Sequence, residues 1–253
     1  MKLFRPRFNQ REGTPDSELK PNPVHVYPAC NCVNVIHATQ QDGWTEPDLH
    51  QDKPDTTAAA WRALEEYIQA TAASGNAEFN PRTAIGSSLW EQIVALPRSI
   101  ASLKSVKYMI LYGSHLVRIP PDIGQMENLE EFDPYTSYKL HWFPYEITRC
   151  KKLVRSRVST RALYGNYKVR PPFPRLPASA PDILPDCCSV CGWPFGGSGP
   201  TQVWISLAVA TDVLPLLVHA CSEDCIQRLP KPHSNYVPVP HRGGLDLVQP
   251  AGR

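Results

Sequence analysis

A pattern that repeats every 23 to 24 residues constrains the fold of this chain more than any other feature. Each of three consecutive units opens with an apolar residue and a proline, and these prolines are Pro97, Pro120 and Pro144. A further apolar or small residue follows three, six and nine positions after each proline. These nine core positions are Ile100, Leu103, Val106, Ile123, Met126, Leu129, Ile147, Cys150 and Leu153. A period of roughly 20 to 29 residues predicts a stacked repeat with one short strand in each unit.

The pattern apolar-Pro-x-x-Ile-x-x-Leu-x-x-Leu resembles that of bacterial leucine-rich repeat proteins over about residues 89 to 176. The resemblance implies a short solenoid in which each unit adds a strand to one concave sheet. A single unit cannot bury its apolar edge alone, so the units must stack. The chain departs from the family in its strand-end turns, where Ser114, Ser137 and Arg161 replace asparagine. Pro134 and Ser156 also stand at inward strand positions.

The segments on the N-terminal side predict an arm followed by a cap on the repeats. Residues 1–23 are polar, basic and contain proline, which is typical of a flexible N-terminal arm. Residues 24–95 are expected to form a strand and helical cap, with strand composition at 24–38. A first helix is predicted to follow a cap at Asp55, Thr56 or Thr57 and to end at Gly75; its apolar stripe is Trp61, Leu64, Ile68 and Ala72. A second, shorter helix is expected around Ser87 to Leu96.

The C-terminal part, 177–253, is expected to be a separate module after the repeats of 96–176. Its most apolar segment, Val203 to Ala220, is interrupted by Asp212 and Pro215, which argue against a membrane span. We expect this segment to form a buried strand and helix. The predicted fold class is therefore α/β: a short leucine-rich repeat solenoid with an N-terminal helical cap and a C-terminal zinc-stapled α/β module.

The zinc prediction comes from two close cysteine pairs in this module. Cys188 and Cys191 form a C-x2-C pair, and Cys221 and Cys225 form a C-x3-C pair. Two such pairs supply the tetrahedral thiolates that structural Zn²⁺ prefers, and four protein ligands leave no position for a catalytic water. Gly192 allows the sharp turn after the second ligand. Ser222 is predicted to cap a helix, so the whole arrangement looks like a zinc ribbon or treble clef.

Other interpretations of the cysteines remain open at this stage. The absence of an export signal in the given sequence predicts a cytoplasmic location, where disulfides are rare. Cys187 could replace Cys188 as a ligand, and His219 could replace one of the cysteines. Cys30 and Cys32 are too close together to form a standard zinc pair, although His25 or His37 could join them. Cys150, at an inward repeat position, is predicted to be a small core residue.

Charge and motifs bear on the class of function. The chain carries 26 basic and 24 acidic residues, and this balance gives no reason to expect nucleic acid or a membrane as a partner. Neither a phosphate-binding glycine loop nor a hydrolase or metalloprotease motif is found, so no catalytic residue is predicted.

The outward positions of the predicted strands suggest a protein-binding surface instead. They combine tyrosines with acidic and basic side chains, a composition common at interface hot spots. The candidate partner-binding residues are Lys107, Tyr108, Ile110, Tyr112, Glu130, Glu131, Asp133, Tyr135, Arg155 and Arg157. An ordinary solvated sheet face is the competing interpretation.

The sequence therefore predicts a non-enzymatic protein-protein interaction scaffold. Resemblance to small leucine-rich repeat proteins encoded with secreted antibacterial toxins implies the role of an immunity protein that binds and neutralises such a toxin. Two alternatives are a nucleic-acid-binding zinc protein and a repeat-containing effector enzyme with a reactive cysteine. The first is disfavoured because Arg228 is the one lysine or arginine in residues 186–230. The second would need a low-pKa thiol, for which Cys30, Cys32 and Cys187 are the candidates.

Overall fold

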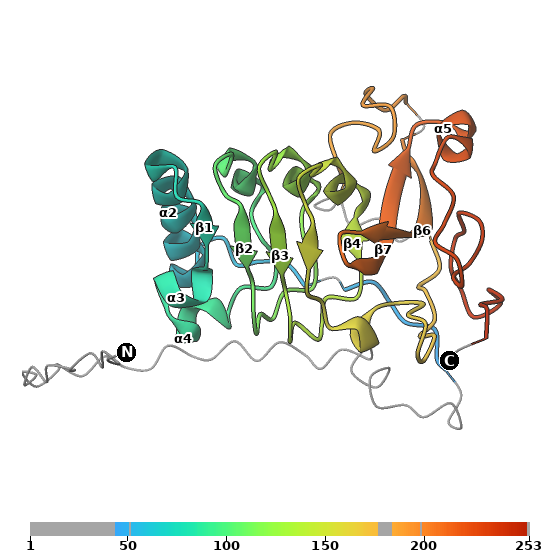
Figure 1. Cartoon of the computed structure of the whole chain (residues 1–253), viewed down its shortest axis with the longest axis horizontal. Helices are drawn as coiled ribbons and strands as arrows, with labels where there is room; N and C mark the ends of the chain where they lie inside the picture. Colours follow the sequence, from blue (N-terminus) through green and yellow to red (C-terminus); the bar gives the residue numbers. More distant parts are fainter. Residues whose placement is uncertain (1–43, 51, 177–183, 198, 252–253) are drawn as a thin grey trace, which may run out of the picture.

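The computed structural model describes residues 44–50, 52–176, 184–197 and 199–251. The predicted arm at 1–23, the strands expected at 24–38, and Cys30 and Cys32 lie outside these described residues. The protein is a mixed α/β structure with one parallel sheet and one mixed sheet (Figure 1). Within the described segments, no helix combines the length and the apolar character needed to cross a membrane.

The parallel sheet takes one strand from each of the three sequence units and a fourth, β1, from the segment before them. Its strand order is β1-β2-β3-β5, with bounds β1 (Glu78–Phe79), β2 (Tyr108–Ile110), β3 (Glu131–Asp133) and β5 (Arg155–Ser156). Tyr108 pairs with Glu131, and Glu131 pairs with Arg155. These partners are 23 and 24 residues apart, the same spacing as the prolines, so the sequence period sets the strand register. The strands of this sheet lie side by side (Figure 1).

A row of 3₁₀ helices lies behind the sheet, one after each unit's proline. They are η1 (Arg98–Ser102), η2 (Pro121–Gln125) and η3 (Tyr145–Arg149). The preceding prolines are extended, with φ between −73° and −69°, which suits the ring's fixed angle at the start of a helix. All nine predicted core positions are buried and belong to one continuous hydrophobic core. Burial of these residues between consecutive units is the main stabilising contribution in this region.

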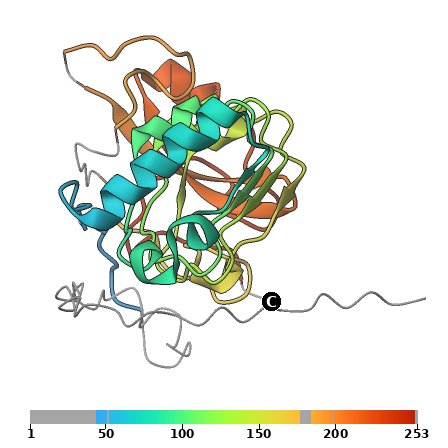
Figure 2. The ribbon, with the colours of Figure 1, turned by 90° about the vertical axis from the view of Figure 1, so that its left-hand side faces the viewer.

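Three helices lie at the N-terminal end of the row, where α2 crosses in front of the strands (Figure 2). Their bounds are α2 (Ala59–Ser74), α3 (Pro81–Ile85) and α4 (Ser87–Trp90). Gly75 ends α2 with φ +67°, as predicted. The predicted side-chain cap is wrong: Ala58 occupies the N-cap, and Asp55 instead accepts a hydrogen bond from the Thr57 N–H.

The buried stripe of α2 differs from the prediction. It consists of Ala60, Leu64, Ile68 and Thr71, whereas Trp61 and Ala72 are only half-buried. The second helix ends at Trp90, short of the predicted Leu96, because the chain then extends and Ala95 forms a β-bridge with Arg118. Helix α3 was not predicted, although Asn80 caps it by accepting from the Thr83 N–H.

The mixed sheet has the strand order β4-β7-β6, with bounds β4 (Phe143–Pro144), β6 (Thr201–Val209) and β7 (Asp212–Ala220). β6 and β7 form an antiparallel hairpin with a two-residue turn at Ala210 and Thr211, so the predicted helix within Val203 to Ala220 is wrong. An apolar run of this kind does not distinguish a buried strand from a buried helix. Two short helices, η4 (Thr160–Ala162) and α5 (Glu223–Gln227), complete the fold.

Side-chain contacts also join the hairpin to the third unit, in addition to the pairing of β4 with β7. A buried aromatic cluster includes Tyr164 and Trp204, whose ring centroids lie 6.0 Å apart at 68°. At the hairpin turn, Ser156 donates from Oγ to Asp212 (2.7 Å), and its carbonyl accepts from the Thr211 hydroxyl (2.7 Å). Ser156 stands where the repeat pattern has an aliphatic residue, because this position ends the parallel sheet against the hairpin.

Candidate metal centre and exposed sheet face

The four predicted zinc ligands lie together at one end of the hairpin. The Sγ atoms of Cys188, Cys191, Cys221 and Cys225 are all within 4.8 Å of one another. Cys221 Sγ lies 3.5 Å from Cys191 Sγ and 3.6 Å from Cys225 Sγ. Four clustered thiols of this kind can bind a metal ion.

Local backbone structure brings the two pairs together. Gly192 has φ +76°, and its N–H donates to the Cys188 carbonyl (3.0 Å), which closes the turn of the first pair. The second pair begins directly after β7, and the Cys221 N–H donates to Cys188 Sγ (3.3 Å). Ser222 caps α5 by accepting from the Cys225 N–H (3.3 Å). The sequence-based roles of Gly192 and Ser222 are therefore confirmed.

The thiols differ in their pKa values. Burial raises the pKa of Cys188, but backbone N–H donors from Cys191, Cys221 and Val190 outweigh it and lower that pKa to about 6. The pKa of Cys221 is raised to about 12, because its thiol donates toward Cys191 and also lies beside Cys225 and Cys188. A cation bound among the four sulfurs would favour the thiolate form of each ligand.

The two alternative ligands lie outside the cluster. Cys187 is half-buried and forms a β-bridge with Pro194. His219 is buried beside Gln202, with 3.0 Å between the two Nε2 positions, and burial lowers its pKa to about 4. Cys150 is buried at its inward repeat position, as predicted, and burial raises its pKa to about 12. The cysteines that the structure describes are all free thiols.

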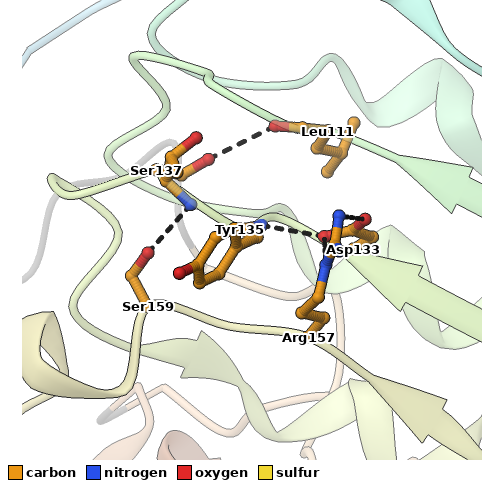
Figure 3. A network of polar contacts seen from close by, with 7 residues as sticks. Leu111, Asp133, Tyr135, Ser137, Arg157 and Ser159 are labelled. Atoms are coloured by element: carbon orange, nitrogen blue, oxygen red, sulfur yellow. Dashed lines mark hydrogen bonds and ion pairs between the residues drawn. The ribbon is translucent and has the colours of Figure 1, made fainter.

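The predicted binding residues lie on the exposed face of the parallel sheet, where their charges are paired between neighbouring strands. Lys107 binds Glu130 at 2.9 Å, and Arg155 binds Glu131. Arg157 makes a bidentate contact with Asp133, at 3.0 Å from Nε and 2.6 Å from Nη2 (Figure 3). The acidic middle strand is thus neutralised by the basic residues on either side, so the face has little net charge.

Tyrosines form the apolar part of the same face. Tyr112 and Tyr135 have ring centroids 6.1 Å apart, and the Arg157 guanidinium lies 5.9 Å from the first and 5.2 Å from the second. Tyr108, Tyr112 and Tyr135 are each 37–41% exposed, while Ile110 is half-buried. The arginine therefore holds two rings in place while part of each ring stays accessible.

The strand-end turns are connected by serine hydroxyls. The hydroxyls of Ser114 and Ser137 are buried and lie 2.6 Å apart, and Ser137 also donates to the Leu111 carbonyl (3.3 Å). Ser159 accepts from the Thr136 N–H at 2.9 Å (Figure 3). Ser114 and Ser137 thus link adjacent units, whereas Arg161, at the corresponding place in the third unit, is exposed.

Comparisons with known proteins give structural similarity of low coverage. No protein-family model matches the chain. No curated protein is significantly similar to it. Among solved structures, a leucine-rich repeat protein of Leptospira interrogans aligns with 19% identity and a TM-score of 0.25. The alignment covers 38% of this chain and 35% of that one, so the chain spans little more than a third of its neighbour.

Proposed function

We propose that this chain is a non-enzymatic scaffold that binds a protein partner through the exposed face of its parallel sheet. In this proposal, residues 96–176 form a short leucine-rich repeat solenoid, and a structural Zn²⁺ holds the C-terminal module. The observation that carries the binding proposal is the pair of accessible tyrosines, Tyr112 and Tyr135, held by Arg157 on a face whose charges are already paired.

Pre-positioned aromatic side chains are the usual anchors of protein interfaces, because they bury a large area at a small cost in side-chain entropy. The paired charges on the same face also favour its burial against a partner. An unpaired carboxylate would have to lose its hydration on binding, whereas Asp133 and Glu131 already have partners. The face is thus suited to burial against another protein.

The binding proposal is tested with the native protein as bait in an extract of its own cells. The Tyr112→Ala/Tyr135→Ala variant should lose a stoichiometric partner that the native protein retains. Trp193→Ala is the matched control, because it removes a ring that is 73% exposed on the cysteine-bearing loop, away from the sheet. Equal retention by all three proteins would show that the sheet face is not the binding surface.

A secreted toxin is the partner that the sequence resemblance implies. The identity of the captured protein tests this part separately: a nuclease, protease or other toxin bound with equal stoichiometry supports an immunity role. Inhibition of that toxin's activity by the native protein, and not by the double tyrosine variant, is the functional measurement. A captured protein without toxic activity would leave the scaffold proposal in place and contradict immunity.

Zinc is the metal that the ligand set favours. Four thiolates suit Zn²⁺ and leave no open coordination position, which supports a structural role. Elemental analysis of purified protein should find about one zinc per chain. Cys188→Ser should lose it, while Cys187→Ser, one residue earlier, should keep it. Zinc bound equally by both variants, or none in the native protein, would contradict the assignment.

A further inference from the structure

We propose that a groove at the carboxyl ends of the parallel strands recognises an acidic segment of the partner protein. This inference rests on the proposed protein-binding function and adds the chemistry of the partner. The groove has a volume of about 900 Å³. It is lined by the strand-end turns of the first two units and by η4, and it shares Tyr135 with the exposed sheet face. We call it the strand-end groove.

The strand-end groove is basic. Lys139, Arg161 and Lys168 line it together with His115, and its lining includes no aspartate or glutamate. The contrast with the adjoining sheet face is clear, because there each acidic side chain has a basic partner one strand away. Cationic charge that the fold leaves uncompensated in a concave surface attracts an anionic group.

The three cations are free of ion pairs within the part of the chain that the structure describes. Arg161 and Lys168 are exposed, and Lys139 is half-buried. Lys168 lies over the ring of Tyr167, with Nζ 5.5 Å from its centroid, which holds the ammonium without neutralising it. An acidic ligand would therefore gain three charge contacts without breaking any pair seen here.

The groove also has an aromatic rim on a constrained turn. Tyr135 and Tyr138 are 41% and 55% exposed, and Thr136 between them has φ +63°, a conformation that is unfavourable for a β-branched residue. Its backbone N–H is fixed by Ser159, and its buried hydroxyl has no hydrogen-bond partner. Strain of this kind persists where the surrounding structure enforces it, and here it sets the positions of the two rings.

An acidic protein segment fits these features better than a nucleic acid does. Three cations in one groove match a few carboxylates, and the tyrosines match apolar side chains between them. A nucleic acid that passed along the neighbouring sheet face would find no excess of positive charge there, because Lys107, Arg155 and Arg157 are already paired with acidic side chains. The ligand proposed for the groove is therefore an extended protein segment that combines Asp or Glu with an apolar or aromatic residue.

The test is selection from a random twelve-residue peptide library displayed on phage, with the native full chain as bait. Enrichment of peptides that combine Asp or Glu with aromatic residues is expected. The affinity of the best peptide is then measured by fluorescence anisotropy. The triple variant Lys139→Gln/Arg161→Gln/Lys168→Gln should bind this peptide at least tenfold more weakly than the native protein does. Peptide binding by the native protein should also weaken as the salt concentration is raised. The charge-matched control Lys151→Gln/Lys152→Gln/Lys231→Gln replaces lysines outside the groove lining and should bind as the native protein does.

Each other outcome overturns the inference, and the outcomes separate it from the proposed function. Selection of neutral or basic peptides that bind at the sheet face, with binding lost in the Tyr112→Ala/Tyr135→Ala variant, would contradict recognition of an acidic segment. The proposed function as a protein-binding scaffold would stand. A library that yields no specific binder would contradict the acidic-segment inference, while capture from the cell extract still tests the scaffold function separately. A single-stranded RNA 20-mer that binds more tightly than the best peptide, with loss in the groove variant, would assign the groove to nucleic acid.

Discussion

Gly113 and Thr136 occupy the same place in consecutive strand-end turns, and both have left-handed backbone, with φ +65° and φ +63°. They are 23 residues apart, which is the offset of the strand register between β2 and β3. Glycine adopts this conformation without penalty, whereas a β-branched residue does not. The second unit therefore carries backbone strain that the first one avoids.

Thr136→Gly should relieve this strain. We expect the free energy of unfolding to rise by about 1 kcal/mol, since the cost of the left-handed conformation exceeds the entropy that glycine adds to the unfolded chain. Urea denaturation measures the change. Thr83→Gly, in helix α3, is the matched control and should destabilise the protein by roughly 0.3 kcal/mol, the difference in helix propensity between the two residues. A destabilised Thr136→Gly would show that the threonine side chain has a packing role.

Gly124→Ala should destabilise the packing of η2 on η3. A Cβ at this position would lie 2.6 Å from the Glu146 carbonyl oxygen and 2.9 Å from its Cβ. Because much of this obstruction is backbone, the two helices must move apart, and we expect a loss of about 2–3 kcal/mol in unfolding experiments. Gly196→Ala is the control, because nothing lies within 4 Å of its added Cβ. Similar midpoints for the two variants would contradict this packing.

Glu146→Gln should stabilise the protein at neutral pH. Glu146 is only 1% exposed, neither carboxyl oxygen makes a hydrogen bond of good geometry, and burial raises its pKa despite the proximity of Ser189 and Arg149. The folded state therefore holds this proton at pH values where the unfolded chain, with a carboxyl pKa of about 4.3, has lost it. Stability is thus lost as pH rises above about 4.3, up to the folded-state pKa.

The glutamine variant cannot ionise, so its advantage over the native protein should grow with pH through that window and then level off. Urea titrations of both proteins between pH 4 and pH 8 measure it. Glu127→Gln, an exposed side chain two residues into the connection after η2, should follow the native curve. A variant whose advantage does not depend on pH would contradict the raised pKa.

His241 should give the opposite pH dependence from Glu146, because its contribution to stability is lost as pH falls. Burial lowers its pKa to about 4, and its ring contacts Phe173 edge-on at 4.6 Å. Between about pH 6.5 and pH 4 the unfolded chain binds a proton that the folded state does not, so stability falls as pH falls through this range. The full effect is about 3 kcal/mol. His241→Phe should remove this component from the stability-pH curve, whereas replacing the exposed His115 should not.

The repeat period was sufficient to predict much of the fold. The spacing of the prolines matched the strand register, and the spacing of Ile100, Ile123 and Ile147 identified the core face, because both repeat in register along the chain. The grouping of Cys188 with Cys191, Cys221 and Cys225 was also predicted, since the spacing of each pair limits how far apart its sulfurs can lie.

The features that the sequence did not indicate depend on contacts between distant segments. The helix expected within Val203 to Ala220 was wrong because β7 is buried at consecutive positions from Leu214 to Ala220 and so lacks the alternation of a half-exposed strand. On α2 the predicted Leu64 and Ile68 are buried, but Ala60 and Thr71 take the end positions of the stripe in place of Trp61 and Ala72. The strand-end groove combines turns of two units with η4, and no local pattern marks such an assembly.

The contact of Ser156 with the hairpin turn has a consequence for how this protein can change in evolution. Repeat proteins commonly lengthen by duplicating internal units, and each new unit needs an open strand edge to join. Here the last strand already hydrogen-bonds to Thr211 and Asp212 through Ser156. An extra unit placed after the third would remove the contacts with Ser156 that hold the hairpin turn. The same contact covers an edge that could otherwise pair with another molecule and start aggregation.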